Sequence, residues 1–326
     1  MTKRQMTDNN ILADFLVKTS IGYYCRYGNF YVDAMAPVAV NVISHAHGDH
    51  ATAGHKAMWA TEATFAFMRN KFSKLPEDTL HTVSFGTAFS LGDVTVTLYA
   101  AGHILGSAQI LMTYQGVRYL YTGDYKLQVD PTCEPIEMVA ADVLITESTF
   151  ANPAVKHPDP VTEILKLKDR HSNIMLGCYT LGKSQRITAL INQHLPELEV
   201  LVHHKMHPVH KLYDQLGPQK LRYTLYNRKA MKEGPTNKVY LVPPLTFNSY
   251  FKAKNVLKAF ASGWARLQQQ NDIELYISDH VDWLDILSYV NHVKPREIWT
   301  VHGDGKQLQA HFEGTLLVRD ILKVVE

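Results

Sequence analysis

A short segment of the chain carries four potential metal ligands in six positions: His45, His47, Asp49 and His50. It follows an apolar run, so a strand that ends at Ser44 is expected to lead into it. In extended backbone, side chains two positions apart point the same way, so His45 and His47 can bind one ion. Asp49 and His50 follow where we expect a helix to begin, and they point toward a second ion. Imidazole and carboxylate ligands suit zinc, and less selectively manganese or iron.

The alternative is a solvated, histidine-rich turn in which Asp49 caps the following helix. Four ligand-type residues in six positions favour the metal site. The arrangement resembles the metal-binding signature of the metallo-β-lactamase fold. That resemblance implies that further ligands recur downstream, at the ends of strands.

Three later residues match these expected positions. His103 lies in a glycine-rich turn after the strand expected over residues 94–100, and it would complete the shell of the first ion. Asp124 follows the second strand of a predicted hairpin, residues 117–121, where the fold family has the carboxylate that bridges two metals. His302 precedes a glycine at another strand end and would complete the second shell.

The resemblance therefore implies seven ligands for two divalent metal ions, with zinc favoured over manganese. The ligands divide as follows: His45, His47 and His103 on one ion, Asp49, His50 and His302 on the other, and Asp124 between them. Open positions remain on both metals for water and substrate.

The rest of the chain indicates how these ligands are positioned. Its 326 residues are 46% hydrophobic and 20% charged, so it can bury a sizeable core as one large or two modest domains. Residues 20–150 have the pattern of short strands with turns. From about residue 159, helical stretches alternate with brief apolar strands, which predicts an α/β unit with a parallel sheet. After about residue 272 the pattern returns to strand, helix, strand.

Because His302 must join ligands from the first half of the chain, the middle block is predicted to be an insertion. We expect an α/β protein in which residues 1–150 and 276–326 form a metallo-β-lactamase αββα sandwich. Residues 151–275 would form a reduced, inserted α/β domain.

Three further motifs bear on the reaction. Glu147 ends an apolar strand and is followed by hydroxyl side chains. His280 lies in a Ser-x-His-x-Asp setting at another expected strand end. A glycine turn that opens a predicted helix lacks the glycines of a Walker loop, but it offers backbone N–H groups and side chains for a phosphate: Lys183, Ser184 and Arg186.

Together these motifs resemble the β-CASP nucleases, the branch of the metallo-β-lactamase fold that cuts nucleic acids. The three marker positions of that family are matched by Glu147, His280 and His302. The resemblance covers essentially the whole chain and is greatest to the bacterial ligase-associated DNA exonucleases, whose inserted β-CASP domain is similarly reduced. A histidine at the last marker is typical of RNA enzymes, whereas the subgroup acts on DNA. We expect DNA to be preferred over RNA.

The resemblance implies a dinuclear-metal phosphodiesterase, an exonuclease that acts on single-stranded DNA ends in repair or processing. The metal ions would activate a water molecule and neutralise phosphate oxygens. Asp49 could also act as a base toward that water. His280 would hydrogen-bond the scissile phosphate or protonate the departing oxygen, and Glu147 would fix the tautomer and orientation of His280.

Charge and composition bear on partners and location. Residues 151–240 contain fourteen Lys and Arg against seven Asp and Glu, a net charge of +7, which leaves −5 for the rest of a chain whose net charge is +2. This basic segment suggests a seat for nucleic-acid phosphates, with a merely solvated face as the alternative. The family resemblance suggests a DNA ligase or a helicase as a partner. We recognise no signal peptide or membrane span, and three widely separated cysteines argue for the cytoplasm.

Three other functions remain open. A β-CASP ribonuclease would differ only in its substrate. A thioester or lactam hydrolase would have no role for Glu147, His280 or the inserted block. A non-catalytic nucleic-acid scaffold would not need all seven ligand positions filled, as they are in this sequence.

Overall fold

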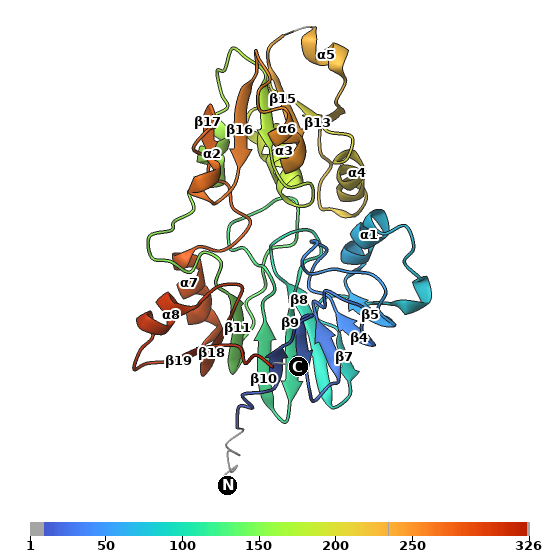
Figure 1. Cartoon of the computed structure of the whole chain (residues 1–326), viewed down its shortest axis with the longest axis vertical. Helices are drawn as coiled ribbons and strands as arrows, with labels where there is room; N and C mark the ends of the chain where they lie inside the picture. The colour runs from blue at the N-terminus through green and yellow to red at the C-terminus, as the bar shows by residue number, and fades with distance from the viewer. Residues whose placement is uncertain (1–9, 234, 325–326) are drawn as a thin grey trace.

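The computed structural model describes residues 10–233 and 235–324, which form two lobes (Figure 1). In the view of Figure 1, two sheets and their helices make the lower lobe, and a third sheet with its helices makes the upper lobe. The chain builds most of the lower lobe first, passes through the upper lobe and then returns. Its last helices, in red, lie beside the green strand β11 in this view.

The first sheet has six strands that lie side by side in chain order. The first three pair antiparallel, and the third to the sixth pair parallel. The strands are β1 (Leu16–Lys18), β2 (Tyr23–Cys25), β3 (Phe30–Val32), β4 (Val40–Val42), β5 (Ala57–Ala60) and β6 (Leu80–Thr82). Helix α1 (Glu62–Lys71) and the short 3₁₀ helix η1 (Glu77–Thr79) lie between β5 and β6. The ligand-rich segment 45–50 therefore forms part of the loop between β4 and β5.

The second sheet has seven strands in the order β19-β18-β11-β10-β9-β8-β7. They are β7 (Ala88–Leu91), β8 (Val94–Ala100), β9 (Ala108–Tyr114), β10 (Val117–Tyr121), β11 (Val143–Glu147), β18 (Glu297–Val301) and β19 (Leu317–Asp320). Strand β18 pairs parallel with β11, with Val301 opposite Glu147. This pairing puts His302, which follows β18, at the same sheet edge as the residues that follow β11.

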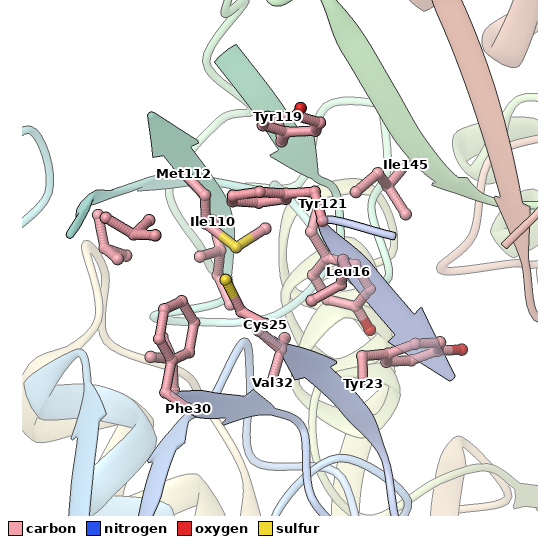
Figure 2. Packing of buried hydrophobic residues seen from close by; sticks show 14 of the residues in the cluster. Leu16, Tyr23, Cys25, Phe30, Val32, Ile110, Met112, Tyr119, Tyr121 and Ile145 are labelled. Atoms are coloured by element: carbon pink, nitrogen blue, oxygen red, sulfur yellow. The ribbon is translucent and has the colours of Figure 1, made fainter. Parts of the chain in front are cut away.

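The main hydrophobic core lies between these two sheets (Figure 2). Figure 2 shows Cys25 and Phe30 of the first sheet on the side that faces Met112 and Tyr121 of the second, and all four side chains are buried. Burial of such apolar surface is the main favourable term in folding. The core thus holds the two sheets face to face.

Helices cover the outer faces of the sandwich. α1 packs on the first sheet through Phe65 and Met68. On the second sheet, α7 (Trp283–Val293) packs through Ile286, and α8 (Lys306–His311) packs through Leu308. The αββα arrangement and the α/β class predicted from the sequence are therefore confirmed.

The third sheet takes all its strands from residues 174–275, which lie inside the range expected for the insertion. Its order is β14-β13-β15-β12-β16-β17, and every pair is parallel. The strands are β12 (Ile174–Gly177), β13 (Glu199–Val202), β14 (Thr224–Leu225), β15 (Lys238–Val242), β16 (Leu257–Ala261) and β17 (Ile273–Leu275). The exact domain bounds at 150 and 275 stay a prediction.

Helices precede or connect the strands of the third sheet. They are α2 (Pro160–Leu165), α3 (Lys183–His194), α4 (His207–Leu216), α5 (Arg228–Lys232), α6 (Pro244–Ser249) and the 3₁₀ helix η2 (Ala265–Leu267). Between the lobes, the ring of Phe67 on α1 lies 5.3 Å from the ring of Tyr213 on α4. Over the described parts of the chain, we find no helix with the length and apolarity that a bilayer crossing requires.

Two local predictions differ from the structure. No helix begins at Asp49, because residues 48–50 form a turn in which the His50 and Ala51 N–H groups donate to the His47 carbonyl. The Thr52 hydroxyl donates to the Ala34 carbonyl, which ties this segment to the first sheet rather than letting a helix propagate. The strand expected to reach His280 ends earlier, at Leu275, because residues 276–282 cross from the third sheet back to the sandwich.

Candidate metal centre and active site

A cleft with a volume of about 310 Å³ lies where the two lobes meet. The sandwich lines it with loops that follow β4, β8, β10 and β11. The third sheet lines it with segments that follow β12, β16 and β17. Because parallel strands bring their carboxyl ends to one sheet edge, these segments converge although they are far apart in the sequence. Chemistry-bearing residues on its wall include His47, His103, Asp124, Lys183, Trp264 and His280.

Three imidazoles and one carboxylate converge in this cleft. His47 Nδ1 lies 3.2 Å from His45 Nε2 and 3.1 Å from His103 Nε2. Asp124 Oδ2 lies 3.6 Å from His45 Nε2 and 3.8 Å from His103 Nε2. In a tetrahedral zinc site with bonds of about 2.0–2.1 Å, ligand atoms lie about 3.3 Å apart. These four side chains therefore fit the ligand shell of one zinc ion.

A second group of ligand-type residues shares Asp124. His50 Nε2 lies 3.5 Å from Asp124 Oδ2, and one ligand atom each of His50, Asp124 and His302 lie within 4.8 Å of one another. His302 has a left-handed backbone with φ of 51°, which costs about 1–3 kcal/mol outside glycine. The next residue, Gly303, has no room for a side chain, since a Cβ would lie 2.2 Å from Ser148 Oγ. The chain thus accepts local strain to turn the His302 loop toward the second group.

Asp49 stands at the edge of this second group. Its side chain is 76% exposed, and its Oδ2 lies 4.0 Å from His50 Nε2. It lines the cleft, but the compact grouping of His50, Asp124 and His302 does not include it. Its roles as ligand and as base both stay predictions.

The imidazoles of the first group have their other ring nitrogens engaged by the protein. The pairs are His45 Nδ1 with Ser44 Oγ at 3.0 Å, His103 Nδ1 with the Asp279 carbonyl at 2.8 Å, and His47 Nε2 with the Leu181 carbonyl at 3.1 Å. Such contacts fix the orientation of a ligand ring and leave one nitrogen for a metal. Two of these three partners come from the segments around the third sheet, so the upper lobe helps to shape the ligand set.

Asp33 holds His50 in the same way. Its Oδ2 lies 2.8 Å from His50 Nδ1 and accepts from the Tyr121 hydroxyl at 3.0 Å. Its Oδ1 accepts from the Ser44 backbone N–H at 2.7 Å. Sequence reasoning missed this residue because a single aspartate after a strand carries no distinctive signal. Its positive φ of 50° shows that it occupies a tight turn after β3.

Burial and charge set the protonation of the ligand imidazoles. Burial is the main cause that lowers the pKa of His45 and of His103 well below the ordinary value. Burial would also lower the pKa of His50, but the charges of Asp124 and Asp33 outweigh it and raise this pKa to about 10. For Asp124, burial would raise the pKa, but the surrounding histidines, His50 first, hold it well below its usual range. Neutral His45 and His103 are ready to bind a metal, whereas His50 must release a proton.

The buried carboxylate of Glu147 pairs with the partly exposed ring of His280 beside the metal ligands. His280 Nδ1 lies 3.1 and 3.0 Å from the two carboxylate oxygens of Glu147. The His280 ring lies 5.1 Å from the ring of His103, and Asp124, Glu147 and His280 form a third compact group. Burial would lower the pKa of His280, but the charges of Glu147 and Asp124 together raise it to about 9. The second ring nitrogen, Nε2, is left for the cleft.

Lys183 lies in the cleft wall but is not free. Its Nζ lies 3.1 Å from Asp279 Oδ2 and donates to the Ile277 carbonyl at 2.7 Å. Burial lowers its pKa to about 8. A phosphate that enters the cleft would compete with Asp279 for this ammonium group. Phosphate binding by Lys183 therefore stays a prediction.

The expectation that Ser184 and Arg186 bind phosphate does not fit their surroundings. Both side chains are fully buried. Ser184 Oγ donates to the Thr180 carbonyl, and Arg186 donates to the Ser278 carbonyl and to Asp279 Oδ1. The Ser184 hydroxyl and the Arg186 guanidinium, which were expected to bind a phosphate, thus donate to protein groups instead. Arg186 instead ties α3 to the segment that carries His280.

Comparisons with known proteins agree with this geometry. Residues 273–313, which contain His280 and His302, match the family model RMMBL, the Zn-dependent metallo-hydrolase RNA specificity domain. A probable DNA ligase from Opitutus terrae is 31% identical over 305 residues, which are 88% of this chain and 29% of that protein. An endoribonuclease ysh1 from Aspergillus fumigatus is 30% identical over 131 residues, 37% of this chain and 15% of that protein. This chain thus spans less than a third of the length of these relatives.

One solved structure is similar over most of the chain. It is a protein of unknown function from Enterococcus faecalis V583, with a TM-score of 0.60 and 14% identity, and the match covers 88% of this chain and 80% of that one. At this identity the likeness supports the fold alone.

Proposed function

Since this chain belongs to the β-CASP branch of the metallo-β-lactamase family, we propose that it is a metal-dependent nuclease. The proposed reaction is hydrolysis of phosphodiester bonds at single-stranded DNA ends, as an exonuclease in repair or processing. One observation supports this most strongly. Asp124 belongs to all three compact groups of ligand-type side chains, so the Glu147–His280 pair stands at the same point as both metal shells. A lactam or thioester hydrolase would have no use for that pair.

Two divalent ions, zinc by preference and manganese as the alternative, would supply water activation and charge neutralisation when bound. His45, His47, His103 and Asp124 would hold one ion. His50 and His302 would hold the other with Asp124, and Asp49 would approach from the cleft edge as a ligand or as a base.

We assign to His280 the protonation of the departing oxygen. His280 lines the cleft and Glu147 engages its Nδ1, so a proton on the remaining nitrogen, Nε2, could pass to the oxygen that leaves the phosphorus. Glu147 also stabilises the protonated ring through its charge. The Glu147 carboxylate is buried, whereas the His280 side chain is 29% exposed and lines the cleft.

We propose DNA over RNA because the relative described as a probable DNA ligase matches 88% of this chain. A DNA ligase, or a helicase, is the protein partner proposed on the same ground. A cytoplasmic location is proposed because Cys25, Cys133 and Cys178 are buried free thiols. The net charge of +7 over residues 151–240 fits a nucleic-acid partner.

A ribonuclease is the second candidate. It is favoured by the RNA specificity domain matched over residues 273–313 and by the endoribonuclease relatives. Those relatives match a smaller share of this chain than the probable DNA ligase does.

One digestion separates these proposals. End-labelled single-stranded DNA and RNA of the same sequence are incubated with the zinc- or manganese-loaded protein, with either the 5′ or the 3′ end blocked. Single-nucleotide shortening of DNA that one block prevents supports the DNA exonuclease and gives its polarity. Faster cleavage of RNA would replace it by the ribonuclease, and cleavage of neither strand would refute the nuclease proposal.

A further inference from the structure

Two large aromatic side chains lie exposed on the cleft wall with no part in the proposed chemistry. Trp264 is 41% exposed and Tyr179 is 56% exposed, and both line the cleft that holds Asp124 and His280. Aromatic side chains of this size usually stabilise a protein or a complex by being buried. Because both rings are exposed inside the cleft, we infer that a bound ligand covers them.

The third sheet brings these rings to the same edge. Tyr179 follows β12 and Trp264 follows β16, and these strands pair parallel as neighbours. His280 follows β17, which is the neighbour of β16 on its other side. The aromatic rings therefore belong to the upper-lobe wall of the cleft, opposite the metal ligands of the sandwich.

The Trp264 ring is held in place rather than loosely tethered. Its centroid lies 4.5 Å from that of Phe150, whose ring lies 6.1 Å from His280. The guanidinium of Arg266 lies 5.1 Å from the Trp264 ring centroid. The preceding Gly263 is closely packed, since a Cβ there would lie 2.8 Å from the His157 ring and 3.0 Å from the Phe150 ring. The loop is thus pressed against its neighbours, and the ring is preorganised.

We propose that Trp264 stacks on an unpaired nucleobase next to the scissile phosphate, and that Tyr179 receives the neighbouring base. The proposal rests on the nuclease function above and deepens it. Stacking on aromatic rings tolerates any base, as a nuclease that acts on strand ends requires. A cleft of about 310 Å³ is at the lower end of the range for small-ligand sites, which suits a splayed single strand rather than a duplex.

The test measures binding rather than turnover. Full-length, metal-loaded protein is titrated into a fluorescein-labelled, phosphorothioate-linked single strand, which resists hydrolysis. A second strand has the same backbone but abasic sites in place of the terminal bases. The variants are Trp264→Ala, Trp264→Phe and, as a matched control, Tyr250→Ala, which removes an aromatic side chain that is 61% exposed and lies outside the cleft lining.

We expect Trp264→Ala to weaken binding of the base-containing strand by about 10- to 100-fold, and to leave binding of the abasic strand unchanged. Trp264→Phe should recover most of the affinity, and Tyr250→Ala should change neither strand. Equal loss for both strands, or no loss, would overturn the stacking proposal. Binding of the normal strand without any cleavage of its phosphodiester counterpart would refute only the nuclease proposal. Failure of the parent protein to bind either strand would refute both.

Discussion

The carboxylate of Asp33 lies 2.8 Å from Nδ1 of His50, while Nε2 of the same ring lies 3.5 Å from Asp124. One imidazole is thus held between a supporting carboxylate and a ligand carboxylate. This arrangement fixes the ring and raises the basicity of the nitrogen that would meet a metal.

Asp33→Asn should therefore weaken metal binding at the second site without removing a ligand. We expect a loss of about 10- to 100-fold in affinity, measured by competition with a coloured chelator. The first site provides a comparison. Asp33 is linked to His45 there through the Ser44 hydroxyl, which donates to Asp33 Oδ2 and lies 3.0 Å from His45 Nδ1, so a smaller loss is expected at that site. Unchanged affinity at both sites would show that Asp33 serves only the turn after β3.

The number of metal ions can be tested at His302. Its side chain completes the second group only, whereas His103 belongs to the first. We expect His302→Ala to reduce the bound metal from two ions to one, as measured by native mass spectrometry. His103→Ala should remove the other ion. Retention of two ions by both variants would contradict the ligand division proposed here.

His280→Ala should abolish most of the turnover while leaving metal content intact, because His280 is not part of either predicted shell. General acid catalysis typically contributes about 10²- to 10⁴-fold, and we expect kcat on single-stranded DNA to fall within that range. Metal analysis of the variant gives the control. Full turnover with normal metal content would exclude His280 from the chemistry.

Glu147→Gln should change how the rate depends on pH. The charges of Glu147 and Asp124 raise the pKa of His280 to about 9 against the effect of burial. A general acid is lost as pH rises through its pKa, so removal of the Glu147 charge should move the alkaline limb of kcat to lower pH. Bound metal ions are cationic and lower the His280 pKa in both proteins, so the direction of the difference is kept. If the alkaline limb lies at the same pH in both proteins, the Glu147 charge does not set the pKa of His280.

Residues of the candidate site could be predicted from the sequence where they lie at the ends of strands with neighbouring glycines. His103, Asp124 and His302 are such cases, and the structure brings all three to the segment that carries His45. The αββα sandwich was predicted from the resemblance to the metallo-β-lactamase fold, whereas the strand pattern by itself indicated a β-rich part and an α/β part.

Contacts between residues that are distant in the sequence could not be predicted from local patterns. The cations of Lys183 and Arg186 at a helix start resemble a phosphate site, but both are engaged by Asp279, almost a hundred positions later in the chain. Asp33 was missed for the same reason, since its partner His50 follows another strand. No local pattern encodes a tertiary ion pair.

The group around Asp279 gives the last prediction. Asp279 is buried between Lys183 and Arg186 of the upper lobe and Lys126 of the sandwich, at 3.1, 3.1 and 3.7 Å. Lys126 also pairs with Asp130 at 2.6 Å. Three cations and two carboxylates therefore bridge the lobes, and Asp279 is the residue next to His280 in the chain.

Asp279→Asn would leave buried cations short of a partner, a change that costs about 3 kcal/mol or more in comparable cases. Burial would raise the pKa of Asp279, but Lys183 and the other cations hold it well below its usual range. A carboxyl with a depressed pKa in the folded state contributes stability above its unfolded pKa, about 3.9, and this contribution is lost as pH falls further. We therefore expect the variant to unfold at lower urea concentration at pH 7, with a difference that shrinks at acidic pH. Asp14→Asn, which breaks the exposed pair with Arg26, should shift the midpoint far less, and equal shifts would show that the buried group does not join the lobes.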